Sequence, residues 1–161
     1  MWLAEIAVVL FLILLNGFFA MCELAVVNSR HGRLEQLAEE GRKGARAALA
    51  LAENPKDFLA RVQIGVTFTA IVAGTFSGAT LAKRLEDFLL PYPVAAPYAK
   101  SIAIGVVVVT VTYLTLVIGE LVPKHVALKD PEAIASRVAR PLAFLTAGAR
   151  RWSRSSIAQP I

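Results

Sequence analysis

The sequence has little of the chemistry on which most enzymes and metal-binding domains depend. It contains a single cysteine, Cys22, which excludes an internal disulfide. It has only two histidines, His31 and His125, and each stands beside a basic residue. No nucleophile–base pair and no cluster of histidine and cysteine metal ligands is visible. The sequence therefore predicts that the protein is not an enzyme.

Charge is also scarce, and it is missing from three long segments. Only 18% of the 161 residues are charged and 57% are hydrophobic, whereas ordinary soluble domains have about 25% charged residues. Trp2 to Cys22 carries one charge, Glu5, and residues 62–82 and 101–119 carry none. A helix needs about 20 apolar residues to cross a bilayer. A soluble bundle would instead need a polar stripe on each helix, which residues 102–111 lack.

We therefore expect an all-α membrane protein with three transmembrane helices, at about 3–28, 58–82 and 100–121. The first segment is longer than the apolar part of a secretory signal peptide, and it has neither a basic start nor a good cleavage site before Glu23. We interpret it as a retained helix.

The positive charges indicate orientation rather than nucleic-acid binding, although the net charge is +5. Three lysines and arginines lie between the second and third spans: Lys83, Arg84 and Lys100. Six lie between the first and second spans: Arg30, Arg33, Arg42, Lys43, Arg46 and Lys56. Seven follow the third span: Lys124, Lys129, Arg137, Arg140, Arg150, Arg151 and Arg154. Because cytoplasmic loops carry the excess of positive charge, we expect an inner-membrane protein with its N-terminus outside and its C-terminus in the cytoplasm.

Two amphipathic regions flank the spans on the predicted cytoplasmic side. Residues 30–54 read as two short helices separated by a stop at Gly41, and they are expected to lie against the membrane surface; a solvated linker is the alternative. A further interfacial helix is expected over about 130–150, with Asp130 as its N-cap and Pro131 at its first position. Pro141 should break or kink it. The polar end of the chain looks like a cut before a further part.

The third span ends in the sequence GELVPK, which places a carboxylate at the edge of the hydrocarbon. Glu120 follows 19 uncharged residues, and such a carboxylate marks an ion or proton pathway by default. Pro123 has no N–H, so it should break the helix and free the carbonyl of Gly119. Together they predict a cation site with oxygen ligands, suited to Mg²⁺ or Na⁺. The alternative is that Glu120 pairs with Lys124, four residues on.

Other polar and small residues inside the spans have two interpretations. Asn16 interrupts the first span, where it either joins helices or acts as a ligand. Thr67 shares a helix face with Gln63 and offers an oxygen, although most such hydroxyls bond to their own helix. Gly74 and Gly78 have the spacing that allows two helix backbones to approach closely, which predicts helix packing there.

Three sequence blocks in this order, FFAMCEL, VQIG and GELVPK, resemble the transmembrane domain of the cyclin-M and CorB/CorC family of magnesium transporters, whose bacterial members are often labelled haemolysin-like. The resemblance covers nearly the whole chain. It implies three spans with a juxtamembrane belt, a homodimer in the lipid bilayer, and cytoplasmic CBS domains that bind ATP and follow such a domain. It also implies Mg²⁺ export coupled to Na⁺ entry.

The family's Mg²⁺ ligands are matched only in the third span. Gly119, Glu120 and Pro123 agree with the family pattern, but Val66 and Ala70 stand where the family has asparagines, and its serine falls near Ala20. Asn16 and Thr67 are the nearest oxygen donors that could replace them. Another cargo, such as Na⁺, a different divalent ion or a polyamine, therefore stays open. So does a non-transporting membrane anchor for a CBS module, which would have no need of Glu120 beside Pro123.

Overall fold

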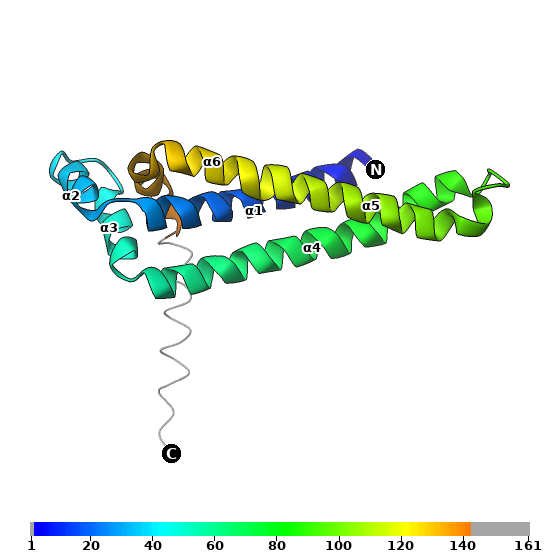
Figure 1. Cartoon of the computed structure of the whole chain (residues 1–161), viewed down its shortest axis with the longest axis horizontal. Coiled ribbons are helices and arrows are strands. Elements are labelled where there is room, and N and C mark those ends of the chain that lie inside the picture. The colour runs from blue at the N-terminus through cyan, green and yellow to red at the C-terminus, as the bar shows by residue number, and fades with distance from the viewer. Residues whose placement is uncertain (1, 143–161) are drawn as a thin grey trace, which may run out of the picture. The chain divides into compact units, whose positions relative to one another are not determined.

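The computed structural model describes residues 2–142, and every regular element in that part of the chain is a helix (Figure 1). Residues 131–142 form the last helix of the described part. The rest of the helix expected over 130–150 lies outside the described residues. The elements are α1 Trp2–Asn28, α2 His31–Glu39, α3 Ala45–Glu53, α4 Pro55–Leu89, the 3₁₀ turn η1 Ala96–Tyr98, α5 Ala99–Leu116, the π turn η2 Val117–Leu121, and α6 Val122–Lys129.

Three helical stretches are long and apolar enough to cross a membrane: Trp2–Asn28, Pro55–Leu89 and Ala96–Lys129. The predicted all-α membrane fold with three spans is thus confirmed, and the chain is a multi-pass membrane protein. The second and third helices extend beyond the spans expected at 58–82 and 100–121. A helix can continue outside the hydrocarbon where its polar side chains pair with each other. In α4, Lys83 pairs with Asp87 one turn on, at 2.9 Å.

The chain divides into two compact units. The first, which we call the membrane unit, comprises Met1–Ala20 and Gln63–His125. The second, the juxtamembrane unit, comprises Met21–Val62 and Val126–Ile161, of which residues up to 142 are described. Both α1 and α4 contribute to each unit.

The membrane unit has a small internal core and a large apolar exterior. Its core residues come from three helices: Val9, Ile13, Ala82, Val107 and Val111. Large side chains on the outside remain exposed, among them Phe11, Phe68 and Val109. An apolar exterior of this kind is what lipid tails require and what water disfavours.

The only charge in the first apolar segment has a partner within the membrane unit. The Glu5 carboxylate accepts hydrogen bonds from the Arg84 guanidinium of α4 at two nitrogens. A two-point contact of this kind fixes geometry as well as charge. It joins the beginning of α1 to the end of α4.

In the juxtamembrane unit the predicted helix boundaries are confirmed at two positions. Gly41 has φ 75°, a left-handed conformation that favours glycine, and the N–H of Arg42 bonds back to the Leu37 carbonyl at 2.9 Å to close α2. Asp130 caps the helix over residues 131–142 by accepting the N–H of Ala133 at 3.2 Å. The helix still includes Pro141, where a break or kink was expected. Any break after residue 142 lies outside the described residues.

The apolar faces of the short helices are used inside the juxtamembrane unit. They are buried against other described residues of the chain, and the position of these helices at the membrane surface stays a prediction. The buried face of α3 consists of alanines, which let helices pack closely against each other. The buried residues are Leu34 and Leu37 of α2, Ala45, Ala48 and Ala52 of α3, and Ala135, Val138, Ala139 and Leu142 of the last described helix.

Candidate cation site in the membrane unit

The third span widens into a π turn where a helix break was expected. Across η2 the N–H of Val122 bonds to the carbonyl of Val117, five residues back instead of four. The helix then continues through Pro123 to Lys129. The expectation that Pro123 breaks the helix is therefore wrong, for a physical reason. A proline removes one donor, and the extra residue of a π turn lets the following residues resume helical bonding.

The carbonyl of Gly119 is the one that Pro123 would serve in a regular helix, and Asn16 serves it instead. The Asn16 Nδ2 group donates to the Gly119 oxygen at 3.0 Å. Because a carbonyl can only accept, this contact fixes the orientation of the amide. Asn16 Oδ1 then accepts from Thr69 Oγ1 at 2.9 Å. These bonds join α1, η2 and α4 in the interior, where Asn16 and Thr69 are nearly fully buried.

Glycine allows α1 to approach the π turn this closely. A Cβ on Gly17 would lie 2.8 Å from Pro123 Cγ and 3.0 Å from the Ile118 oxygen. A Cβ on Gly119 would lie 3.2 Å from the Ile13 oxygen. Since the first distance is shorter than a Cβ can accept without movement, the Asn16 hydrogen bond depends on the glycine beside it.

The Glu120 carboxylate is engaged elsewhere. Its Oε1 accepts a hydrogen bond from Lys124 Nζ at 2.6 Å, so the contact of the alternative interpretation is present. Both side chains are partly exposed, at 46% for Glu120 and 35% for Lys124. Glu120 and Gly119 thus have separate partners in this structure.

Glu120 also lines a groove of about 310 Å³ between α4 and the third span. Two hydroxyl-bearing residues of α5, Thr112 and Thr115, line the same groove. On the α4 side the groove is lined by Ala70 and Gly74, which have little or no side chain and supply no side-chain oxygen. Asn16 and Gly119 are not among the lining residues. The groove therefore offers one carboxylate, two hydroxyls and the Lys124 ammonium beside them.

The structure separates Thr67 from the other predicted ligands. Thr67 is exposed, whereas Thr69, two residues further on, contacts Asn16. The signal that could have identified Thr69 is a stripe of small residues four apart, Thr69, Ala73 and Ser77, all of them buried. Thr67 as a ligand stays a prediction.

The remaining predicted positions are placed as follows. Val66 is partly buried and Ala20 is fully buried, and neither supplies a side-chain oxygen. Among the described residues, no atom beyond the local α4 backbone lies within 4 Å of a Cβ added at Gly74 or Gly78, so helix packing at these two glycines stays a prediction. Within residues 2–142 no three histidine, cysteine or acidic side chains group together as metal ligands. A bare metal ion would find too few ligands here, while a hydrated one could be held through its waters.

Comparison with known proteins places the chain in a family. Residues 7–147 match the family described as the cyclin M transmembrane N-terminal domain. A UPF0053 protein of Synechocystis, sll0260, is 49% identical over 135 residues, which cover 84% of this chain and 30% of that protein. The YhdP protein of Bacillus subtilis, also a UPF0053 protein, is 31% identical over 140 residues, 87% of this chain and 32% of its own length.

A third relative carries a functional name. The polyamine export protein of Escherichia coli is 32% identical over 142 residues, which cover 88% of this chain and 32% of that protein. The chain thus spans about a third of the length of these relatives. The resemblance first noted in the FFAMCEL, VQIG and GELVPK blocks is confirmed, and the chain belongs to the family of the cyclin M transmembrane N-terminal domain.

Proposed function

We propose that this domain is the membrane part of a cation transporter and that Glu120 holds the cargo. The observation that carries the proposal is the ion pair between Glu120 and Lys124 at the rim of the groove. It means that this carboxylate already binds a positive charge at the place where the apolar span ends. Glu120 is the only acidic residue between Asp87 and Asp130. A carboxylate in such a span is costly, so its presence there points to a function.

Mg²⁺ export coupled to Na⁺ entry is the activity that the family resemblance favours. For this chain we propose that Mg²⁺ would be held through Glu120, the hydroxyls of Thr112 and Thr115, and several retained waters. One carboxylate with several waters is a usual environment for Mg²⁺, which gives up its water reluctantly. Val66 and Ala70 supply no side-chain oxygen that could replace the ion's waters. Their presence therefore favours a hydrated Mg²⁺ over a fully dehydrated one.

A polyamine is the second candidate cargo, and a specific contact favours it. The group on Glu120 is the primary ammonium of Lys124, which is the same chemical group that ends a polyamine. The small wall at Ala70 and Gly74 leaves room for an alkyl chain along the groove. A relative of similar coverage is named a polyamine export protein.

Two further properties belong to the same proposal. We expect a homodimer in the lipid bilayer, because Gly74 and Gly78 are exposed on α4 and a Cβ added at either would meet no atom of another described element within 4 Å. We also expect cytoplasmic CBS domains in the full protein, with the N-terminus of this domain outside and its C-terminus in the cytoplasm of the inner membrane.

Flux into liposomes tests the proposal. The purified protein is reconstituted and challenged separately with Mg²⁺, Na⁺ and spermidine, and Glu120→Gln is compared with Glu86→Gln, a carboxylate near the end of α4 outside this groove. We expect one cation to be moved by the wild type and by Glu86→Gln, and its flux to be lost in Glu120→Gln. Flux that survives Glu120→Gln would place the site elsewhere. No flux of any cation would favour the membrane-anchor alternative.

A further inference from the structure

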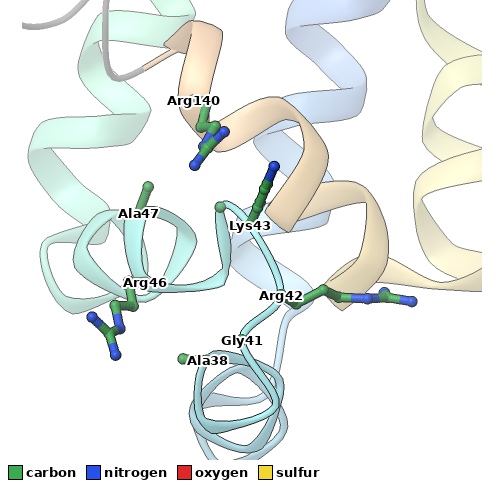
Figure 2. Close-up of a pocket in the computed structure, with 8 residues that line it drawn as sticks. Ala38, Gly41, Arg42, Lys43, Arg46, Ala47 and Arg140 are labelled. Atoms are coloured by element: carbon green, nitrogen blue, oxygen red, sulfur yellow. The ribbon is translucent and has the colours of Figure 1, made fainter.

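The juxtamembrane unit contains a second cavity, of about 440 Å³, that the cation site does not use (Figure 2). It lies between the turn that joins α2 to α3 and the helix over residues 131–142. Four basic residues line it: Arg42, Lys43, Arg46 and Arg140. Within residues 2–142, no acidic side chain lines it. The cavity is therefore suited to an anion.

Two of the four charges face the same space. In Figure 2 the Lys43 ammonium and the Arg140 guanidinium point into the same space from opposite sides of the cavity. Arg42 and Arg46 point away from that space, in opposite directions. Among the described residues, none of the four basic side chains appears in an ion pair. Two like charges that share a cavity repel each other, and a bound anion would offset that repulsion.

The cavity is built by the fold rather than by chance rotamers. Gly44 has φ 97°, which a residue with a side chain rarely adopts. A Cβ there would lie only 2.0 Å from the Ser136 carbonyl oxygen, so the turn packs directly on the helix that carries Arg140. Only glycine permits this contact. It holds the backbone of Lys43 and the helix of Arg140 at a fixed separation.

The place of the cavity in the chain favours a membrane lipid as the source of the anion. The juxtamembrane unit includes the C-terminal end of α1 and the N-terminal end of α4, which are both candidate spans. One nine-residue helix, about 14 Å long, separates the turn from each of those ends. The apolar faces of α2 and α3 are buried, whereas Arg42, Lys43 and Arg46 are exposed and available to an anion. We propose that this cavity binds the phosphate headgroup of an anionic phospholipid.

Lipid titration monitored by native mass spectrometry tests this proposal. The protein in mild detergent is titrated with phosphatidylglycerol or phosphatidylcholine, and the double variant Lys43→Gln/Arg140→Gln is compared with Lys56→Gln/Arg137→Gln. The control pair removes the same charge from exposed residues of the same unit that do not line the cavity. We expect wild type and control to retain phosphatidylglycerol in preference to phosphatidylcholine. Binding to the cavity variant should be weaker on the order of tenfold.

Several results would overturn the proposal. Equal weakening in both double variants would mean that only general charge attracts the lipid. Equal retention of the two lipids would mean that the headgroup charge is not read. Free glycerol phosphate is added as a competitor, and displacement of the lipid at a matching concentration would make a soluble phosphate the natural occupant. All four altered residues are exposed, and thermal unfolding in phosphatidylcholine verifies that each variant folds.

Discussion

The side-chain amide of Asn16 donates a hydrogen bond to the carbonyl of Gly119, which lies 103 residues further along the chain. This contact supplies the donor that Pro123 cannot, and it ties the first span to the π turn of the third. The turn is therefore held from outside its own helix. Any change at Asn16 should act on the geometry next to Glu120 as well as on stability.

Replacing Asn16 by alanine should lower the stability of the membrane unit. The variant removes the Asn16 donor of the Gly119 carbonyl and one acceptor of Thr69, whose hydroxyl keeps the Gly65 carbonyl of its own helix at 2.9 Å. Side-chain hydrogen bonds in membranes contribute about 0.6 kcal/mol on average and rarely more than about 1.7, so two lost bonds predict a decrease of about 1–2 kcal/mol. Thermal or denaturant unfolding in detergent measures it.

Asn28→Ala is the matched control for that variant. Asn28 is exposed and donates to Leu24 of its own helix at 2.9 Å, so its loss should change stability by less than about 0.5 kcal/mol. Equal effects of the two substitutions would contradict a special role of the Asn16 contact.

Adding a methyl group at Gly17 should also separate α1 from the π turn. In Gly17→Ala the new Cβ meets Pro123 Cγ at 2.8 Å and the Ile118 oxygen at 3.0 Å, so the backbones must move apart. Overpacking of this kind costs about 1–3 kcal/mol. Gly105→Ala in α5 has open space around its Cβ and should be neutral or slightly stabilising. Unfolding curves that show the same sign for both would contradict the close approach.

The architecture could be predicted from the sequence because hydrocarbon imposes a simple rule. A span needs about 20 predominantly apolar residues, and the three segments that satisfy this rule form α1, α4 and the third helical stretch. Local caps were equally readable, since Gly41 and Asp130 act within a few residues of their own positions. These features depend on nearby sequence alone.

The site was less predictable, because it depends on how the helices are rotated against each other. Thr67 and Thr69 both offer a hydroxyl, and only the phase of α4 relative to α1 decides that Thr69 meets Asn16. The π turn depends in the same way on a donor that comes from 103 residues away. Hydropathy carries no information on such long-range pairs.

Dimer formation through α4 gives a further test. A Cβ added at Gly74 or Gly78 would meet no atom within 4 Å from any other element of residues 2–142, so a partner helix could approach there. Gly74→Leu should shift the population from dimer to monomer in native mass spectrometry at low detergent. Gly105→Leu, which adds the same bulk to α5, should not. A wild-type protein that is monomeric under these conditions would contradict the dimer.

Orientation can be measured by cysteine labelling. In a background of Cys22→Ala, Glu53→Cys should react only after the membrane is made permeable, and Tyr92→Cys should react with an impermeant reagent added outside. Both positions are exposed, so accessibility reports the side of the membrane rather than burial. The expectation rests on the excess of positive charge around residue 53. Labelling of position 53 from outside intact cells would contradict the predicted topology and indicate the reverse orientation.

Lys124 should act as an internal competitor for the cargo. Its ammonium occupies the Glu120 carboxylate at 2.6 Å, and a cation that binds there must displace it. Lys124→Ala removes the competitor, and because an exposed ion pair contributes at most about 1 kcal/mol, the cation concentration that half-stabilises the protein should fall by up to about fivefold. Glu120→Gln should abolish that stabilisation, since a ligand raises stability only while it binds.

Lys83→Ala provides the control for this last comparison. Lys83 pairs with Asp87 four residues on, at 2.9 Å, in the same arrangement but outside the groove, and its loss should leave the cation response unchanged. Thermal unfolding is followed with increasing Mg²⁺ and, separately, spermidine. If Glu120 only pairs with Lys124 to support the helix, Lys124→Ala should resemble Glu120→Gln and show no cation response. A stronger response in Lys124→Ala distinguishes a cargo site from a structural ion pair, because only a site gains affinity when its tethered cation is removed.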